Sequence, residues 1–174
     1  SLRQYVHDET DTRGYLSVHE ICRIGIELCC ILEYLHGYNG NGILHMDIKP
    51  DNIMLDKDGK VKLIDYDNAV EGNAGLTVES GSPLYAAPEQ YNREKAVIQS
   101  DIYSLGMVIL FMVSHGHIVT DENHKLSEIS SRYSSLYHVI NKSLHHEWGL
   151  RYSSVTYLKQ ELQSIMNWGG GTDE

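Results

Sequence analysis

Apolar residues recur at helical spacing through the first third of the chain. The recurring positions are Ile21, Ile24, Leu28, Ile31, Leu32 and Leu35. Ser17 stands three residues before Glu20, which is the spacing of a helix capping box. The run Asn-Gly-Asn-Gly at 39–42 interrupts the pattern. We therefore predict an amphipathic helix over residues 18–36, whereas residues 1–16 are polar and mixed and predict no element.

Two short β-prone runs follow, and they read NIMLD (52–56) and KVKLID (60–65). Asp58 and Gly59 lie between them, and Asp-Gly is a strong signal for a hairpin turn. Residues 67–85 are rich in Gly, Ser, Asn and Glu and show no periodicity. We predict a hairpin and then a loop of about nineteen residues, a length that is usually functional or disordered.

The second half of the chain predicts helices only. Residues 100–115 are apolar on every side, which is typical of a helix that is buried all round. Further helices fit residues 125–147 and 154–167, and residues 168–174 resemble a linker or tail. The predicted fold class is therefore mainly α with a small β-hairpin, in one domain over residues 1–167.

Charge and cysteine content narrow the possible partners and the compartment. The 174 residues carry a net charge of −10 with no basic run, which argues against nucleic acid or an anionic membrane as a partner. The longest apolar run, 105–113, is far shorter than the ~20 residues that span a bilayer. Cys22, Cys29 and Cys30 share one helical stretch and predict reduced core thiols. We expect a cytoplasmic segment, or the cytosolic part of a membrane-anchored protein.

The candidate chemistry lies around the hairpin. Asp47, Lys49 and Asn52 come just before its first strand, and Asp65 follows its second strand. Because a hairpin brings the outer ends of its strands together, we expect Asn52 and Asp65 to be neighbours. An amide oxygen and a carboxylate suit Mg²⁺ carrying phosphates. Asp47 is then a candidate base for an incoming hydroxyl, and Lys49 a cation for a migrating phosphoryl group.

These motifs resemble the C-terminal lobe of eukaryotic-type Ser/Thr protein kinases. The run HMDIKPDN (45–52) is similar to the catalytic loop H-R-D-L-K-P-x-N, and LIDYDNA (63–69) stands where D-F-G would. GSPLYAAPE (81–89) is similar to the end of the activation segment, and SDIYSLGMVIL (100–110) to the buried central helix. The resemblance implies a kinase-like C-lobe, a helical lobe with a catalytic loop and an activation segment, over residues 1–167.

The resemblance also implies a role for each matching residue. Asp47 would accept the proton of the substrate hydroxyl, and Lys49 would contact the γ-phosphate of ATP. Asn52 and Asp65 would hold Mg²⁺, or Mn²⁺ in its place. Ser82, in the substrate loop, would face Asp47 and Lys49 and help to admit a protein serine or threonine.

Five further positions are expected to be structural. Glu89 would pair with Arg151 and tie the activation segment to the helical base. Asp101 would brace the backbone of the catalytic loop. His45 and Tyr66 belong to the same motifs, and Tyr66 would keep the aromatic body that packs beneath the site.

The chain departs from the family pattern at two positions that bear on regulation and geometry. Met46 replaces an arginine that normally receives a phosphate on the activation loop. We therefore expect activity without phosphorylation of Thr77 or Ser80. Asp67 replaces a glycine. It is a tolerated loop substitution, it restricts the in–out flip of Asp65, or it adds a second carboxylate near the metal.

The resemblance further implies a second, N-terminal lobe, which we do not find in residues 1–174. That lobe supplies the glycine-rich loop and the ATP-contacting lysine of the family. We expect the parent protein to provide it and the isolated chain to be inactive. Two alternatives stay open. One is a pseudokinase-like binding scaffold, and the other is a small-molecule phosphotransferase of the aminoglycoside or choline kinase type, which shares the H-x-D-x-x-x-x-N loop. The run GSPLYAAPEQ (81–90) favours a protein kinase.

Overall fold

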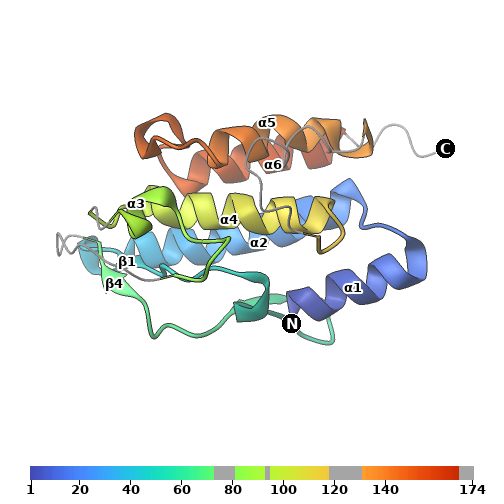
Figure 1. Cartoon of the computed structure of the whole chain (residues 1–174), viewed down its shortest axis with the longest axis horizontal. Helices are drawn as coiled ribbons and strands as arrows, with labels where there is room; N and C mark the ends of the chain where they lie inside the picture. The colour runs from blue at the N-terminus through green and yellow to red at the C-terminus, as the bar shows by residue number, and fades with distance from the viewer. Residues whose placement is uncertain (73–80, 93–94, 118–130, 169–174) are drawn as a thin grey trace.

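The computed structural model describes residues 1–72, 81–92, 95–117 and 131–168. Long helices dominate it, and two of them run through the middle of the molecule (Figure 1). These are α2 (Val18–His36) and α4 (Ile98–Val113), while α5 (Ser134–Ser143) and α6 (Val155–Trp168) pack together on one side. The predicted fold class, mostly helical with small sheets, is confirmed.

Helix α2 forms as its pattern predicts. The Ser17 hydroxyl accepts a hydrogen bond from the Glu20 backbone N–H at 3.1 Å, and the Glu20 carboxylate accepts one from the Ser17 N–H at 3.0 Å. The apolar face of α2 packs against α6. Gly25 allows the close approach, because an added Cβ there would lie 2.9 Å from Leu162.

Helix α4 is the buried helix that the sequence predicts. Every residue from Ser100 to Val113 is buried, and the helix contacts both α2 and α5. A polar side chain buried in such a core needs a hydrogen-bond partner. Asp101, in the first turn of α4, bonds the backbone N–H groups of His45 and Met46 and the side chain of His36 on α2.

Helix α1 (Leu2–Arg13) is absent from the prediction, which found only a polar, mixed stretch there. Ser1 caps its start, and Gly14 ends it with a left-handed φ of 80°. Leu2 and Val6, one turn apart, are its only buried residues. Two apolar anchors do not make a detectable period, so the packing of α1 on the hairpin side of the molecule stabilises a helix that the pattern conceals.

The strands form two small antiparallel sheets. The predicted hairpin is confirmed: β2 (Ile53–Leu55) pairs with β3 (Val61–Leu63) in the register Met54 to Lys62. The second pair joins β1 (Ile43–Leu44) to β4 (Val70–Glu71). Strand β4 falls inside the predicted loop 67–85, so that prediction is wrong at its start, and residues 73–80 lie outside the described residues.

The remaining elements are short. They are η1 (Tyr38–Gly40), η2 (Pro50–Asn52), α3 (Pro88–Tyr91), η3 (Ser131–Tyr133) and η4 (Trp148–Leu150).

The helices predicted over 125–147 and 154–167 correspond to α5 and α6. Residues 125–130 lie outside the described part. Trp168 is the last residue of α6 rather than the first of a tail, and residues 169–174 are outside the described part.

The cysteines follow the prediction only in part. Cys22 and Cys29 are buried free thiols, but Cys30 is exposed, because it lies on the outer face of α2. Among the helices of the described residues, none is long and apolar enough to cross a membrane.

Candidate active site

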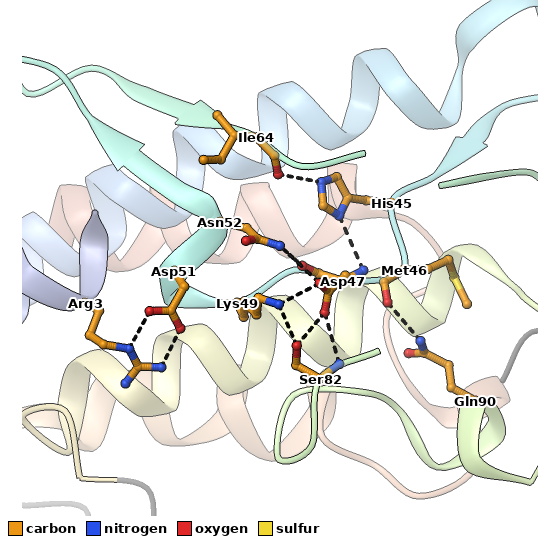
Figure 2. Close-up of polar contacts among 10 residues, drawn as sticks. All are labelled: Arg3, His45, Met46, Asp47, Lys49, Asp51, Asn52, Ile64, Ser82 and Gln90. Atoms are coloured by element: carbon orange, nitrogen blue, oxygen red, sulfur yellow. Dashed lines mark hydrogen bonds and ion pairs between the residues drawn. The ribbon is translucent and has the colours of Figure 1, made fainter. Parts of the chain in front are cut away.

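Three predicted residues meet in one hydrogen-bonded triangle (Figure 2). Lys49 Nζ lies 2.7 Å from Asp47 Oδ2 and 2.7 Å from Ser82 Oγ. The Ser82 hydroxyl donates to Asp47 Oδ1 at 2.8 Å, and the Ser82 backbone N–H donates to the same oxygen at 3.0 Å. The catalytic-loop carboxylate, its neighbouring cation and the substrate-loop hydroxyl are therefore within direct contact, although 35 residues separate Asp47 from Ser82.

The triangle keeps Asp47 ionised. Burial, which leaves this residue only 5% exposed, by itself raises the pKa of its carboxyl group. The hydrogen bonds from Lys49 and Ser82 outweigh that effect, and the pKa lies below its ordinary value. A buried carboxylate that is charged at neutral pH is suited to accept a hydrogen bond and then a proton from a hydroxyl.

Asn52 is fixed by the same carboxylate. Its side-chain nitrogen donates to the Asp47 backbone carbonyl at 3.0 Å and to Asp47 Oδ2 at 3.2 Å. The side-chain oxygen is at the other end of the planar amide and therefore points away from Asp47 (Figure 2). The short η2 turn, which begins at Pro50, presents Asn52 to the site just before β2.

The hairpin brings Asp65 to the same end, as strand pairing predicts. The Ile64 backbone N–H donates to the Asn52 carbonyl at 2.9 Å, so that Asp65 is the next residue along from this contact. Asp65 is exposed and has a left-handed φ of 65°, a conformation that costs a non-glycine residue energy. Within the described residues, no group of three or more His, Cys, Asp or Glu side chains could hold a metal ion.

Asp101 braces the backbone in front of Asp47. Its carboxylate, 0% exposed, accepts from the N–H groups of His45 and Met46, both at 2.9 Å, and contacts His36 Nε2 at 2.9 Å. Met46 has a left-handed φ of 66°. Asp101 on α4 thus fixes the backbone turn that sets the direction of the Asp47 side chain.

His45 connects this turn to the hairpin. Its Nε2 lies 3.3 Å from the Ile64 carbonyl oxygen, and its Nδ1 accepts from the Asp47 N–H at 3.4 Å. Burial lowers the pKa of the ring despite nearby acidic groups. Tyr66 packs edge-on against it, with 4.8 Å between ring centroids, but remains 44% exposed rather than packed beneath the site.

Glu89 and Arg151 form a buried pair away from the triangle. The guanidinium donates to both carboxylate oxygens, at 2.7 and 2.8 Å, and Ser100 donates to Glu89 at 2.7 Å. The side chains are 3% and 0% exposed. Burial raises the pKa of Glu89, but the hydrogen bonds from Arg151 and Ser100 outweigh it and hold the pKa below its ordinary value.

Comparison with protein families matches residues 2–168 to the protein kinase domain. The chain belongs to the protein kinase family. Serine/threonine-protein kinase D of Synechocystis sp. is 32% identical over an alignment of 179 positions, gaps included. The alignment covers 88% of this chain and 35% of that protein. A probable LRR receptor-like serine/threonine-protein kinase of Arabidopsis thaliana is 36% identical over 134 residues, covering 74% of this chain and 15% of that protein.

A third similar kinase comes from mouse. Sperm motility kinase 3A of Mus musculus is 38% identical over 108 residues, covering 58% of this chain and 20% of that protein. The chain therefore spans about a third or less of the length of these relatives. A kinase domain implies ATP, a divalent metal ion and a protein substrate in general terms.

The structure adds residues at the site that sequence reasoning missed. A cavity of about 580 Å³ borders the triangle. It is lined by Arg3, Lys49, Asp51, Ser82, Pro83, Leu84, Tyr85 and Gly116. Arg3 donates to both Asp51 oxygens at 2.7 Å across 48 residues, a contact that leaves no local sequence signal. Met54 and Ile64 are 37% and 42% exposed on the outer face of the hairpin, and strand alternation could have revealed them.

Proposed function

We propose that this chain is the catalytic region of a protein kinase that transfers the γ-phosphate of ATP to serine or threonine hydroxyls of proteins. The single observation that carries the proposal is the Ser82 hydroxyl, which lies 2.8 Å from Asp47 and 2.7 Å from Lys49. A hydroxyl thus fits between the carboxylate and the cation. An acceptor hydroxyl in the same place would have a proton acceptor on one side and a positive charge on the other.

The reaction that these residues would support is an in-line displacement. The acceptor oxygen forms a bond to the γ-phosphorus as the bond from that phosphorus to the bridging oxygen breaks, and ADP leaves. The hydroxyl proton passes to Asp47, whose lowered pKa keeps it ionised beforehand. Lys49 Nζ, 2.7 Å from Asp47, offsets negative charge on the transferred group.

Asn52 and Asp65 are the proposed metal ligands. Hard oxygen ligands of this kind suit Mg²⁺, with Mn²⁺ able to take its place. The bound ion would neutralise charge on the ATP phosphates. Beside them, the exposed Met54 and Ile64 offer an apolar surface on which a planar base could lie.

We further propose that residues 1–167 are the C-terminal lobe of the kinase fold, and that the 174 residues alone transfer no measurable phosphate. The described strands make up only two two-stranded sheets, and the 174-residue sequence contains no G-x-G-x-x-G run. In this family such a run covers the ATP phosphates. The parent protein would supply this cover. Its compartment would be the cytosol, where thiols such as those of Cys22 and Cys29 stay reduced.

Activity without loop phosphorylation is proposed from Met46. Its side chain is 1% exposed and packs with Leu44 and Ala96, so that position offers no cation to a phosphate. Thr77 and Ser80, the loop positions of the prediction, lie outside the described residues. Replacing each by alanine should leave activity intact, whereas loss of activity in either variant would refute this part of the proposal.

The acceptor class tests the proposal. The full-length protein, supplied with labelled ATP and Mg²⁺, would be offered a generic Ser/Thr protein, a basic peptide and a small aminoalcohol. We expect phosphoserine or phosphothreonine in the protein or the peptide. Transfer to the aminoalcohol alone would assign the chain to the small-molecule phosphotransferases instead. Binding of ATP without any transfer would identify a pseudokinase-like scaffold.

A further inference from the structure

We propose that Gln90 is a positioning residue, whose side-chain amide holds the catalytic loop and the substrate loop in register; the proposal rests on the function proposed above. Gln90 is 2% exposed and lies in α3, directly after Glu89. The residues that it would position belong to the triangle of Asp47, Lys49 and Ser82. It acts on the backbone that carries two of these residues.

Both ends of the Gln90 amide are used. Its Nε2 donates to the Met46 carbonyl at 3.0 Å (Figure 2). Its Oε1 accepts from the Ala87 N–H at 2.9 Å. The first bond crosses 44 residues and reaches the catalytic loop. The second fixes the side chain on its own helix turn. A buried carbonyl and a buried N–H would both lose a partner if this amide were removed.

The bond to Met46 matters because of what that residue is. Met46 has a left-handed backbone, with φ 66°, and its carbonyl belongs to the peptide group that leads into Asp47. Asp101 fixes the Met46 N–H at 2.9 Å, and Gln90 fixes the carbonyl. The two contacts hold the strained residue from both sides, and the direction of the Asp47 side chain follows from them.

The substrate loop passes directly over the same bond. Gly81 has φ 119°, and a Cβ added there would lie 2.9 Å from Gln90 Nε2, 2.6 Å from Ala86 Cβ and 3.3 Å from the Met46 carbonyl oxygen. The next residue is Ser82, whose N–H and hydroxyl both bond Asp47. Gln90 therefore lies between the backbones of the catalytic loop and the substrate loop, next to the positions of Asp47 and Ser82.

The base from which Gln90 reaches is rigid. The residue before it, Glu89, is fixed by two hydrogen bonds from Arg151 and one from Ser100. Gln90 is buried and hydrogen-bonded at both ends of its amide, and the residue before it is fixed. It can therefore keep the distance between the catalytic loop and the substrate loop constant. A residue that only filled space there would need no polar atoms.

Two variants of the full-length protein test the inference. Gln90→Leu keeps most of the volume and removes both hydrogen bonds, whereas Gln90→Glu keeps the acceptor for Ala87 and removes the donor for Met46. The matched control is Gln163→Leu on the exposed face of α6. The readouts are amide hydrogen exchange at Ser82, kcat, and KM for ATP.

We expect Ser82 exchange to be at least tenfold faster and kcat at least tenfold lower in both Gln90 variants, with KM for ATP within twofold. The control should match the wild type. Unchanged Ser82 exchange would overturn the proposal, and so would a uniform loss of stability that moves exchange along the whole chain. If the wild type transfers no phosphate at all, the proposed function fails, while Ser82 exchange still decides whether Gln90 holds the two loops together.

Discussion

Replacing Arg151 by methionine should destabilise the fold more than any other single change of a charged side chain discussed above. The guanidinium makes five hydrogen bonds: two to Glu89, and one each to the carbonyls of Gln99, His145 and His146 at 2.9, 2.8 and 3.1 Å. Methionine has similar length and no donor. The change leaves the Glu89 carboxylate, 3% exposed, without its charged partner.

The magnitude follows from the burial of the pair. Breaking a buried ion pair from one side costs about 3–5 kcal/mol, because the partner's charge is left uncompensated. For a chain of this size each kcal/mol lowers Tm by about 2–4 °C. The expected fall in Tm is therefore roughly 6–20 °C.

The assays are thermal unfolding for Tm and urea unfolding for the free energy, both at pH 7, with Arg13→Met as the matched control. The Arg13 side chain is 60% exposed and its ion pairs, to Glu9 and Glu20, lie at the surface, so that its loss should cost about 1 kcal/mol or less. Equal losses of unfolding free energy in the two variants would refute the reasoning, because burial would then add nothing to the stability that the ion pair contributes.

Three more outcomes follow from the structure. Because the folded-state pKa of Glu89 lies below its ordinary value of 4.5, the stability it contributes is present above that pH and is lost as the pH falls through the lower folded value. The gap in urea midpoint between wild type and Glu89→Gln should then narrow from about pH 7 to about pH 3, and a widening gap would contradict this. Asp101→Asn turns one acceptor oxygen into a donor facing the N–H of His45 or Met46, so we expect a loss of about 1–3 kcal/mol in urea unfolding, and an unchanged midpoint would argue against the bracing role. Met54→Asp should weaken Mg-ATP binding by the full-length protein severalfold in equilibrium titration, whereas unchanged affinity would place the nucleotide elsewhere.

The parts of the fold that the sequence predicts are those with a local period or a local turn. Ser17 and Glu20 mark the start of α2 because both atoms of the cap lie within one turn. Asp58-Gly59 marks the hairpin for the same reason. Helix α1 has only Leu2 and Val6 buried, too few to create a period, and tertiary packing decides its existence.

The candidate site divides along the same line. Asp47, Lys49 and Asn52 are close in sequence, so their motif is visible before folding. The contact of Gln90 with Met46 spans 44 residues and that of Arg3 with Asp51 spans 48, and neither residue type suggests its partner. Such contacts depend on how the loops close over the helices, which composition and periodicity do not encode.

The most direct test of the central claim is the rate of phosphate transfer to a protein acceptor by the full-length protein and its Asp47→Asn variant. The substitution keeps the shape of the side chain and removes the proton acceptor, and Asp58→Asn in the exposed hairpin turn is the matched control. General-base catalysis contributes about 10²–10⁴-fold. We predict a fall of that size for Asp47→Asn, with transfer to serine or threonine unchanged in the control. Transfer at the wild-type rate without the Asp47 carboxylate would contradict the account.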